Sequence, residues 1–166
     1  MRKKAQISQV FTYLVILLVV GVIIIFGYKG ISWIINTNCE HQRIVFEKSI
    51  LGFIDEYSNK GSVHEEVLNA PCGVTQVCFV DAVYYSGAVT KPEIQDNVMA
   101  SSLETQPYNN IFIKTKFTEP VGFSNKVTLR PEDRPYKCFN TTSSGKFRFL
   151  FRGLGRKTQI ESSDGG

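Results

Sequence analysis

The stretch VFTYLVILLVVGVIIIFGY, Val10 to Tyr28, decides how this chain is organised. No charged side chain occurs between Lys4 and Lys29. A helix rises ~1.5 Å per residue, so about 20 apolar residues are needed to cross the hydrocarbon core of a bilayer. The many β-branched residues would favour a strand in water, but an apolar run of this length without polar alternation predicts a membrane-spanning helix. A buried core helix is the alternative, and such helices seldom run this long without a charge.

The residues before this stretch indicate how it is inserted. Arg2, Lys3 and Lys4 give a basic start, but the apolar run is too long for a cleaved secretory signal and no convincing small-x-small site follows it. The small residue stands in front of the run instead, at Ala5, followed by Gln6. The apolar segment is therefore expected to stay on the protein.

Residues 4–11, KAQISQVF, resemble the class III signal peptide of archaeal type IV pilin-like proteins. Two further segments, VCFVD at 77–81 and NIFI at 110–113, resemble pilin-like proteins of small-genome archaea. The resemblance implies that a prepilin peptidase cuts between Ala5 and Gln6 on the cytoplasmic side. It also implies assembly with further copies of the chain or with other pilin-like subunits.

The chain departs from that family at the fifth mature position. Many pilins carry a glutamate there, whereas this chain has Val10. A processed protein that does not assemble therefore stays open as an alternative.

Charge and cysteine usage predict the orientation. Three cations precede the span, whereas only Lys29 and Arg43 follow it closely, which favours a cytoplasmic N-terminus. All four cysteines follow the span, and an even number in a small domain is typical of an oxidising exterior. The sequon Asn140-Thr141-Thr142 predicts N-glycosylation at Asn140, which also requires an outside location. The N-terminus is therefore expected inside and the bulk of the chain outside.

The four cysteines allow three disulfide pairings, and the sequence does not choose among them. We favour Cys78 with Cys138, because both lie in strand-like runs, and Cys39 with Cys72, which would tie helix to head. A zinc site is the alternative, but the spacings lack the close pairs of zinc knuckles.

The apolar pattern changes period along the rest of the chain. Up to Tyr57 apolar side chains recur three and four residues apart, which predicts an amphipathic helix, and Asn59-Lys60-Gly61 supplies a stop signal. From Gly61 the period is two, in short runs bounded by Pro, Gly, Asn or Asp. The clearest run is Lys146–Arg152, where three phenylalanines share one face and the basic residues share the other.

These patterns predict an α+β fold: a long N-terminal helix followed by a small, mostly antiparallel β-sheet head. We expect a leader at 1–5, a transmembrane or filament-core helix at 6–29, an amphipathic stem at 30–60 and an extracellular β-rich head at 61–160. A tail at 161–166 should be disordered, because it has no apolar side chain to bury. Within the head we expect a short helix between Pro92 and Leu103 capped by Thr90, and an edge strand at Lys157–Ile160.

Motifs for catalysis are missing from the sequence. His41 and His64 are the only histidines, and His64-Glu65-Glu66 lacks the second histidine of a helical metalloprotease motif. There is no Gly-x-Ser-x-Gly elbow and no Gly-rich phosphate loop. We predict that the protein is not an enzyme and uses no cofactor or metal.

The charge balance argues against a nucleic-acid-binding protein. The chain has 19 Lys plus Arg against 15 Asp plus Glu, and three of the cations belong to the leader. A local basic cluster occurs near the end of the sequence, at Lys146, Arg148, Arg152, Arg156 and Lys157, interleaved with phenylalanines. It could contact DNA or an anionic surface sugar, but we favour the interpretation that it protects an edge strand from unwanted pairing.

Two functions remain. The first is a pilin-like structural subunit, stored in the membrane and assembled into a surface filament through its apolar helix. The second is a single-pass, membrane-anchored surface protein that does not assemble and whose head binds a partner or a glycan.

Overall fold

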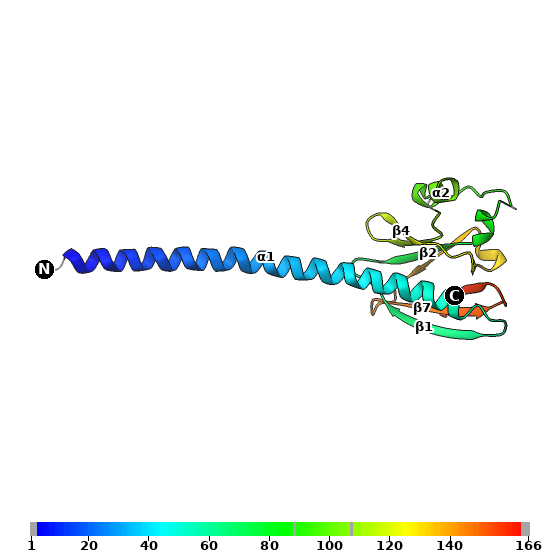
Figure 1. The fold of residues 1–166 in the computed structure, drawn as a ribbon, viewed down its shortest axis with the longest axis horizontal. Helices are drawn as coiled ribbons and strands as arrows, with labels where there is room; N and C mark the ends of the chain where they lie inside the picture. Colours follow the sequence, from blue (N-terminus) through cyan, green and yellow to red (C-terminus); the bar gives the residue numbers. More distant parts are fainter. Residues whose placement is uncertain (1–2, 88, 107, 164–166) are drawn as a thin grey trace. The chain divides into compact units, whose positions relative to one another are not determined.

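The structure is a computed structural model that describes residues 3–87, 89–106 and 108–163, with the backbone alone at 3–10, 32 and 34–36. A long helix precedes a mostly antiparallel β fold, which confirms the predicted α+β class (Figure 1). In chain order the elements are α1 (Lys3–Glu56), β1 (Val63–Asn69), β2 (Gln76–Val80), η1 (Ala82–Tyr85), α2 (Asn97–Glu104), β3 (Ile111–Lys114), β4 (Thr118–Gly122), β5 (Val127–Thr128), η2 (Pro131–Asp133), β6 (Tyr136–Asn140), β7 (Lys146–Gly153) and β8 (Thr158–Ser162).

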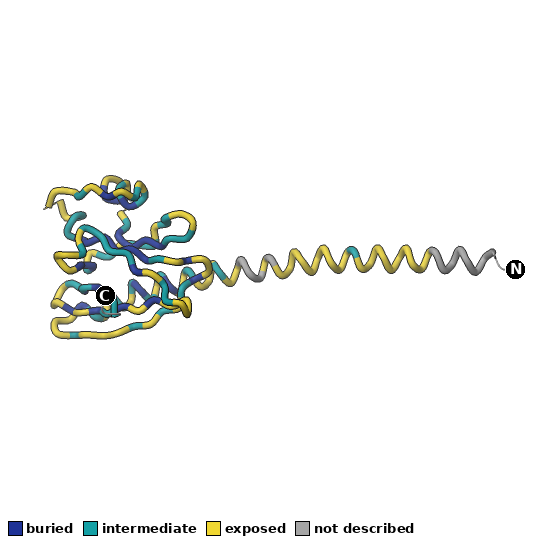
Figure 2. Tube along the Cα trace, turned by 180° about the vertical axis from the view of Figure 1, so that it is seen from behind, coloured by how far each residue is buried: buried dark blue, intermediate teal, exposed yellow. Residues whose placement is uncertain are grey.

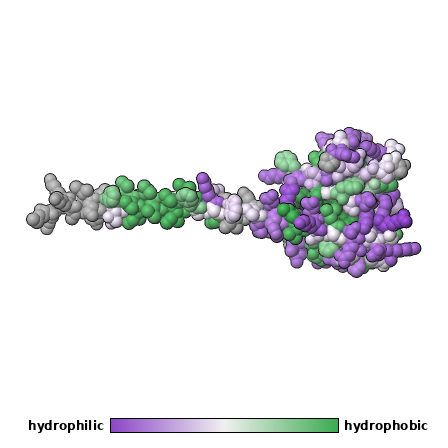
Figure 3. All heavy atoms as spheres, viewed as in Figure 1, coloured by the Kyte–Doolittle hydropathy of each residue, from purple (hydrophilic) through white to green (hydrophobic). Residues whose placement is uncertain are grey.

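The chain divides into two compact units, Met1–His41 and Gln42–Gly166. From here on we use "head" for the second unit, which contains the last part of α1 as well as all the strands. In the first unit, Phe11–Ile31 forms a predominantly apolar helical stretch in which Lys29 is the one charged residue (Figure 3). None of its side chains is buried in the protein (Figure 2).

The head contains two four-stranded sheets. Sheet A has the order β1-β7-β8-β5 and sheet B the order β4-β3-β2-β6. Neighbouring strands are antiparallel except β5 and β8, which are parallel. Strand β7 therefore pairs on both sides, with β1 and with β8.

The main core of the head lies between the inner faces of the two sheets and the last turns of α1. Phe147, Phe149 and Phe151 of β7 are fully buried on one face, as the period-two pattern predicts. Phe149 makes edge contacts with rings of sheet B, and Phe147 lies 5.6 Å from Phe46 of α1 between ring centroids. Further α1 residues in this core are Ile50 and Ile54.

A second core lies on the other face of sheet B, under α2. Cys78 and Phe112 pack there against Met99 and Leu103. The predicted short helix is confirmed, but its cap is Asp96 rather than Thr90. Asp96 Oδ1 accepts hydrogen bonds from two backbone N–H groups of the first turn, which α2 would otherwise leave without partners.

The C-terminal end of the described chain differs from the prediction. Strand β8 is not an edge strand, because it lies between β7 and β5. It also continues to Ser162, so a disordered tail beginning at Glu161 is wrong. Glu161 is almost fully buried, and its carboxylate pairs with Arg130 and Arg152. These ion pairs offset the free-energy cost of burying a charged side chain. The rest of the predicted tail, 164–166, and the leader residues 1–2 lie outside the described residues.

A buried carboxylate fixes the segment that follows β5. Asp81 is fully buried, and its Oδ2 accepts hydrogen bonds at 2.9 Å from Thr128 Oγ1, from the backbone N–H of Leu129 and from Arg134 Nε. Three donors satisfy a charge that would be costly to bury alone. Because these bonds hold both ends of the segment, they position Arg130 beside β8.

Candidate functional site

The apolar stretch of α1 is the first candidate site. Phe11–Ile31 has 21 residues and a mean hydropathy of 2.7, and among the described residues it is the one helix long and apolar enough to cross a membrane. Ala5 and Gln6, the predicted processing residues, lie within the same helix, where only the backbone is described. Cleavage between them stays a prediction.

The cysteines agree with an oxidising environment. Cys78 and Cys138 face each other across the β2–β6 ladder and form a disulfide, as predicted. Cys39 and Cys72 are disulfide-bonded as well, which excludes the zinc alternative for these thiols. The pairing of Cys39 with Cys72 stays a prediction.

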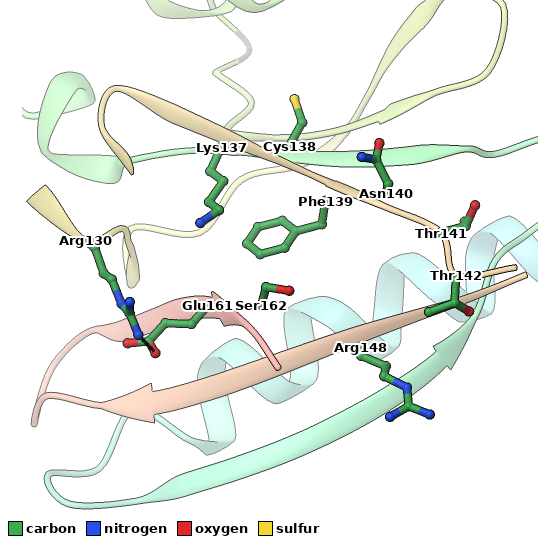
Figure 4. A pocket seen from close by; sticks show the side chains of 10 residues that line it. All are labelled: Arg130, Lys137, Cys138, Phe139, Asn140, Thr141, Thr142, Arg148, Glu161 and Ser162. Atoms are coloured by element: carbon green, nitrogen blue, oxygen red, sulfur yellow. Dashed lines mark hydrogen bonds and ion pairs between the residues drawn. The ribbon is translucent and has the colours of Figure 1, made fainter. Parts of the chain in front are cut away.

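The predicted glycosylation residue, Asn140, is the last residue of β6 and is exposed. Its side-chain oxygen accepts a hydrogen bond from Gln76 Nε2 at 2.6 Å. Asn140 and Cys138 alternate with Lys137 and Phe139 along the strand, so the amide lies on the face of β6 opposite Phe139 (Figure 4). Modification at Asn140 stays a prediction.

The His64-Glu65-Glu66 segment forms no metal site in the described chain. His64 stacks on Tyr57 with ring centroids 4.1 Å apart. Tyr57 Oη donates a 2.6 Å hydrogen bond to Glu66, which raises the pKa of Tyr57 to about 12. No group of three or more His, Cys, Asp or Glu side chains within the described residues is placed to hold a metal ion.

A pocket of about 460 Å³ is the second candidate site. It lies between β6 of sheet B and the paired strands β7 and β8 of sheet A (Figure 4). Lys137 and Phe139 extend from β6 toward β8, and the hydroxyl-bearing side chain of Ser162 lies below the Phe139 ring (Figure 4). The lining consists of Arg130, Lys137, Cys138, Phe139, Asn140, Thr141, Thr142, Arg148, Glu161 and Ser162.

Charges in the pocket are only partly compensated. Arg130 pairs with Glu161, which raises the pKa of Arg130 above its usual range. Lys137 Nζ lies 2.8 Å from Asp133 Oδ1. Arg148 forms no ion pair with any described residue. The lining therefore carries three cations against one carboxylate, and that carboxylate is already paired.

The basic cluster of the sequence lies partly at a sheet edge, as predicted, and partly inside the sheet. Lys146, Arg148 and Arg152 lie on the exposed outer face of β7, which is an interior strand of sheet A. Strand β8 pairs with β7 only from Phe149 to Gly153, so Arg152 has a neighbouring strand on both sides. Lys146 and Arg148 lie beyond the end of β8 and have β1 alone as a neighbouring strand. The interleaved phenylalanines point the other way and are buried, so they are not available for stacking with a ligand.

The sequence did not predict this pocket. Cys138, Asn140, Thr141, Thr142 and Arg148 were named from the sequence, but for other reasons. Arg130, Lys137 and Glu161 come from three separate segments, and no short motif joins them. The alternation of phenylalanine and basic residues in β7 was the one signal in the sequence, and it predicted that Arg148 lies on the solvent side of the strand.

Comparison with protein-family models, with curated proteins and with solved structures finds no match for this chain.

Proposed function

We propose that this protein is a pilin-like structural subunit that is stored in the membrane and assembled into a surface filament through the apolar part of α1. The observation that carries the proposal is the contrast along α1. Its Phe11–Ile31 stretch is apolar and unburied, whereas Phe46, Ile50 and Ile54 are buried in the head. An apolar helix that its own protein does not cover has to be covered by lipid or by other copies.

The proposal assigns the N-terminus to the cytoplasm and the head to the exterior. The three leader cations favour that orientation, and disulfides persist in oxidising compartments. In this proposal a prepilin peptidase removes residues 1–5, and the mature helix starts at Gln6.

Intact mass of the mature protein tests the processing step. The full chain is co-expressed with an archaeal prepilin peptidase, and the N-terminus is identified by mass spectrometry. We expect a chain that starts at Gln6, and we expect Ala5→Leu to abolish the cut while Ala5→Gly, which keeps a small residue, preserves it. A chain that starts at Met1 or Arg2 in the presence of active peptidase would refute the proposal.

Shearing of cells tests assembly separately. A filament subunit is released in long, sedimenting filaments, whereas a membrane protein stays with the cells. Processed protein that is found in membranes alone favours the second candidate, a non-assembling surface protein whose head binds a partner or a glycan. Val10, where many pilins have a glutamate, and the polar pocket of the head are the observations that support this second candidate.

A further inference from the structure

We infer that the outer face of β7 and the adjoining pocket bind an acidic polysaccharide, with its carboxylates on the basic row and its hydroxyls in the pocket. The site lies entirely in the head. It is compatible with a filament subunit and specifies the ligand of the second candidate function, but it does not depend on processing or assembly.

The basic row is formed by Lys146, Arg148 and Arg152. Residues two apart on a strand point to the same side, and the row extends over about 20 Å from Lys146 to Arg152. All three side chains are exposed, and neither Lys146 nor Arg148 has an ion-pair partner among the described residues. This spacing suits an extended polyanion better than a single small anion.

The acidic residues on the same face of sheet A neutralise only a small part of the positive charge of the basic row. Glu65 of β1 lies opposite Leu150 and is exposed to solvent, where its effect is screened. Glu161 lies opposite Leu150 on β8, but Arg130 and Arg152 neutralise its buried carboxylate. Lys146 and Arg148 therefore remain as the two unpaired cations of the row.

Protection of a sheet edge is the competing explanation for these cations, and it covers only part of the row. An edge strand gains from basic side chains because they discourage pairing with other chains. Strand β7 pairs with β1 along the whole row but with β8 only from Phe149 onward, so edge protection accounts for Lys146 and Arg148 and not for Arg152. A sheet face that only contacts solvent needs polar side chains, but these need not share one charge. Three of the four outward positions of β7 carry a positive charge.

The pocket supplies the groups that a saccharide requires. Arg148 borders it and also belongs to the basic row, on the side of β7 away from Phe139 (Figure 4). Thr141, Thr142 and Ser162 also line it. The hydroxyl of Thr142 is already hydrogen-bonded to Lys146 and Ser144, so the hydroxyls of Thr141 and Ser162 are the ones that match those of a sugar. A volume of about 460 Å³ falls in the range of sites for small ligands.

The same geometry argues against single-stranded nucleic acid. Proteins that bind such strands usually place aromatic rings beside the basic groove, where bases stack. Here Phe147, Phe149 and Phe151 are fully buried on the opposite face of β7. An arginine fork and hydroxyls without exposed rings match a carboxylated sugar better than a base.

Binding to the full-length chain in a non-ionic detergent tests the inference. Isothermal titration calorimetry compares oligogalacturonate with a neutral maltooligosaccharide of equal length and with an oligothymidylate. We expect the galacturonate to bind, with an affinity that falls as salt is added, and the maltooligosaccharide to bind at least about tenfold more weakly.

Two double variants locate the site. Lys146→Gln with Arg148→Gln should weaken galacturonate binding about tenfold or more, since each removes a charged hydrogen-bonding group. Lys91→Gln with Lys116→Gln removes the same charge from exposed residues elsewhere in the head and should change the affinity less than about twofold.

Three outcomes would overturn the inference. They are no binding of galacturonate, equal binding of galacturonate and oligothymidylate, and equal losses in the two double variants. Each is independent of the N-terminal mass and of the shearing experiment. A negative binding result therefore leaves the filament proposal unaffected, and a negative processing or shearing result leaves the proposed head site unaffected.

Discussion

Both ends of helix α1 carry apolar side chains but place them differently. In Phe11–Ile31 the apolar residues surround the helix, and none is buried. In the head, Phe46, Ile50 and Ile54 form one stripe that is buried against the two sheets, while Ile44 and Val45 beside it remain exposed. Spacing, rather than hydrophobicity alone, decides what covers a helix.

This difference assigns the two regions to different surroundings. A striped helix is satisfied by one folded neighbour, which the head provides. A helix that is apolar on all sides needs an apolar environment on all sides, such as lipid or a bundle of copies.

Charged residues in the middle of the apolar stretch should release the protein from membranes. Each arginine at the centre of a spanning helix costs about 2.5 to 3.5 kcal/mol, so Val20→Arg with Ile24→Arg should cost about 5 to 7 kcal/mol. The measurement is the fraction of protein in a carbonate-washed membrane pellet. Ile44→Arg with Val45→Arg, at exposed positions of the same helix, is the matched control and should leave the protein in the pellet. Equal retention of both variants would contradict a membrane-spanning function of Phe11–Ile31.

Truncation of the buried stripe should destabilise the head. Ile50 is fully buried in the main core, so Ile50→Ala should lower the free energy of unfolding by about 2 to 5 kcal/mol. Ile44 on the same helix is 46% exposed, and Ile44→Ala should change that free energy by less than about 0.5 kcal/mol. Urea unfolding of the two variants in detergent, followed by near-UV circular dichroism, measures the difference. Equal losses would mean that the head does not distinguish the two faces of α1.

The Cys78–Cys138 disulfide joins β2 to β6 inside the head, across 60 residues of sequence. Replacing both cysteines by alanine should cost about 2 to 4 kcal/mol, because the cross-link limits the unfolded chain. Unfolding with urea compares this variant with one in which Cys39 and Cys72 are both alanine.

Non-reducing peptide mapping of the native chain tests the predicted Cys39–Cys72 pairing at the same time. Four free thiols in the native protein would refute both pairings.

Local patterns were sufficient to predict much of this fold from the sequence. The long α1, the strands β2, β6 and β7, and the inward face of β7 all follow from apolar spacing within one segment. These are the features whose burial is decided by neighbours three, four or two residues away. The predicted disulfide in sheet B is correct because both of its cysteines lie in such runs.

Features that depend on distant partners were missed. β1 reads as a mixture of polar and apolar residues, because its inward positions include His64 and Glu66, which are satisfied by Tyr57 of another segment. β4 contains Pro120, which a sheet tolerates at an edge such as this one. Glu161 looked like part of a polar tail, and the arginines that bury it lie elsewhere in the sequence. The pocket combines all of these difficulties, since its charges come from several strands and loops.

The smallest expected effect concerns the cap of α2, which lies in the head and is independent of the apolar helix. Burial, the largest single influence, raises the pKa of Asp96, but hydrogen bonds from Thr118, Lys114 and the backbone of Met99 outweigh it and leave that pKa below its usual value. A carboxyl with a lowered pKa in the folded state contributes stability above its unfolded pKa, near 4, and the contribution disappears as the pH falls through the folded value.

Asp96→Asn should therefore lower the free energy of unfolding by about 1 to 2 kcal/mol at neutral pH, since asparagine can still cap the helix but cannot pair with Lys114. The difference from the parent protein should shrink below about pH 4, where the aspartate becomes protonated. Urea unfolding over a pH series measures it, and Glu93→Gln, at an exposed position of the segment that leads into α2, is the matched control. A difference that stays constant from neutral to acidic pH would mean that Asp96 stabilises the head by its shape and not by its charge.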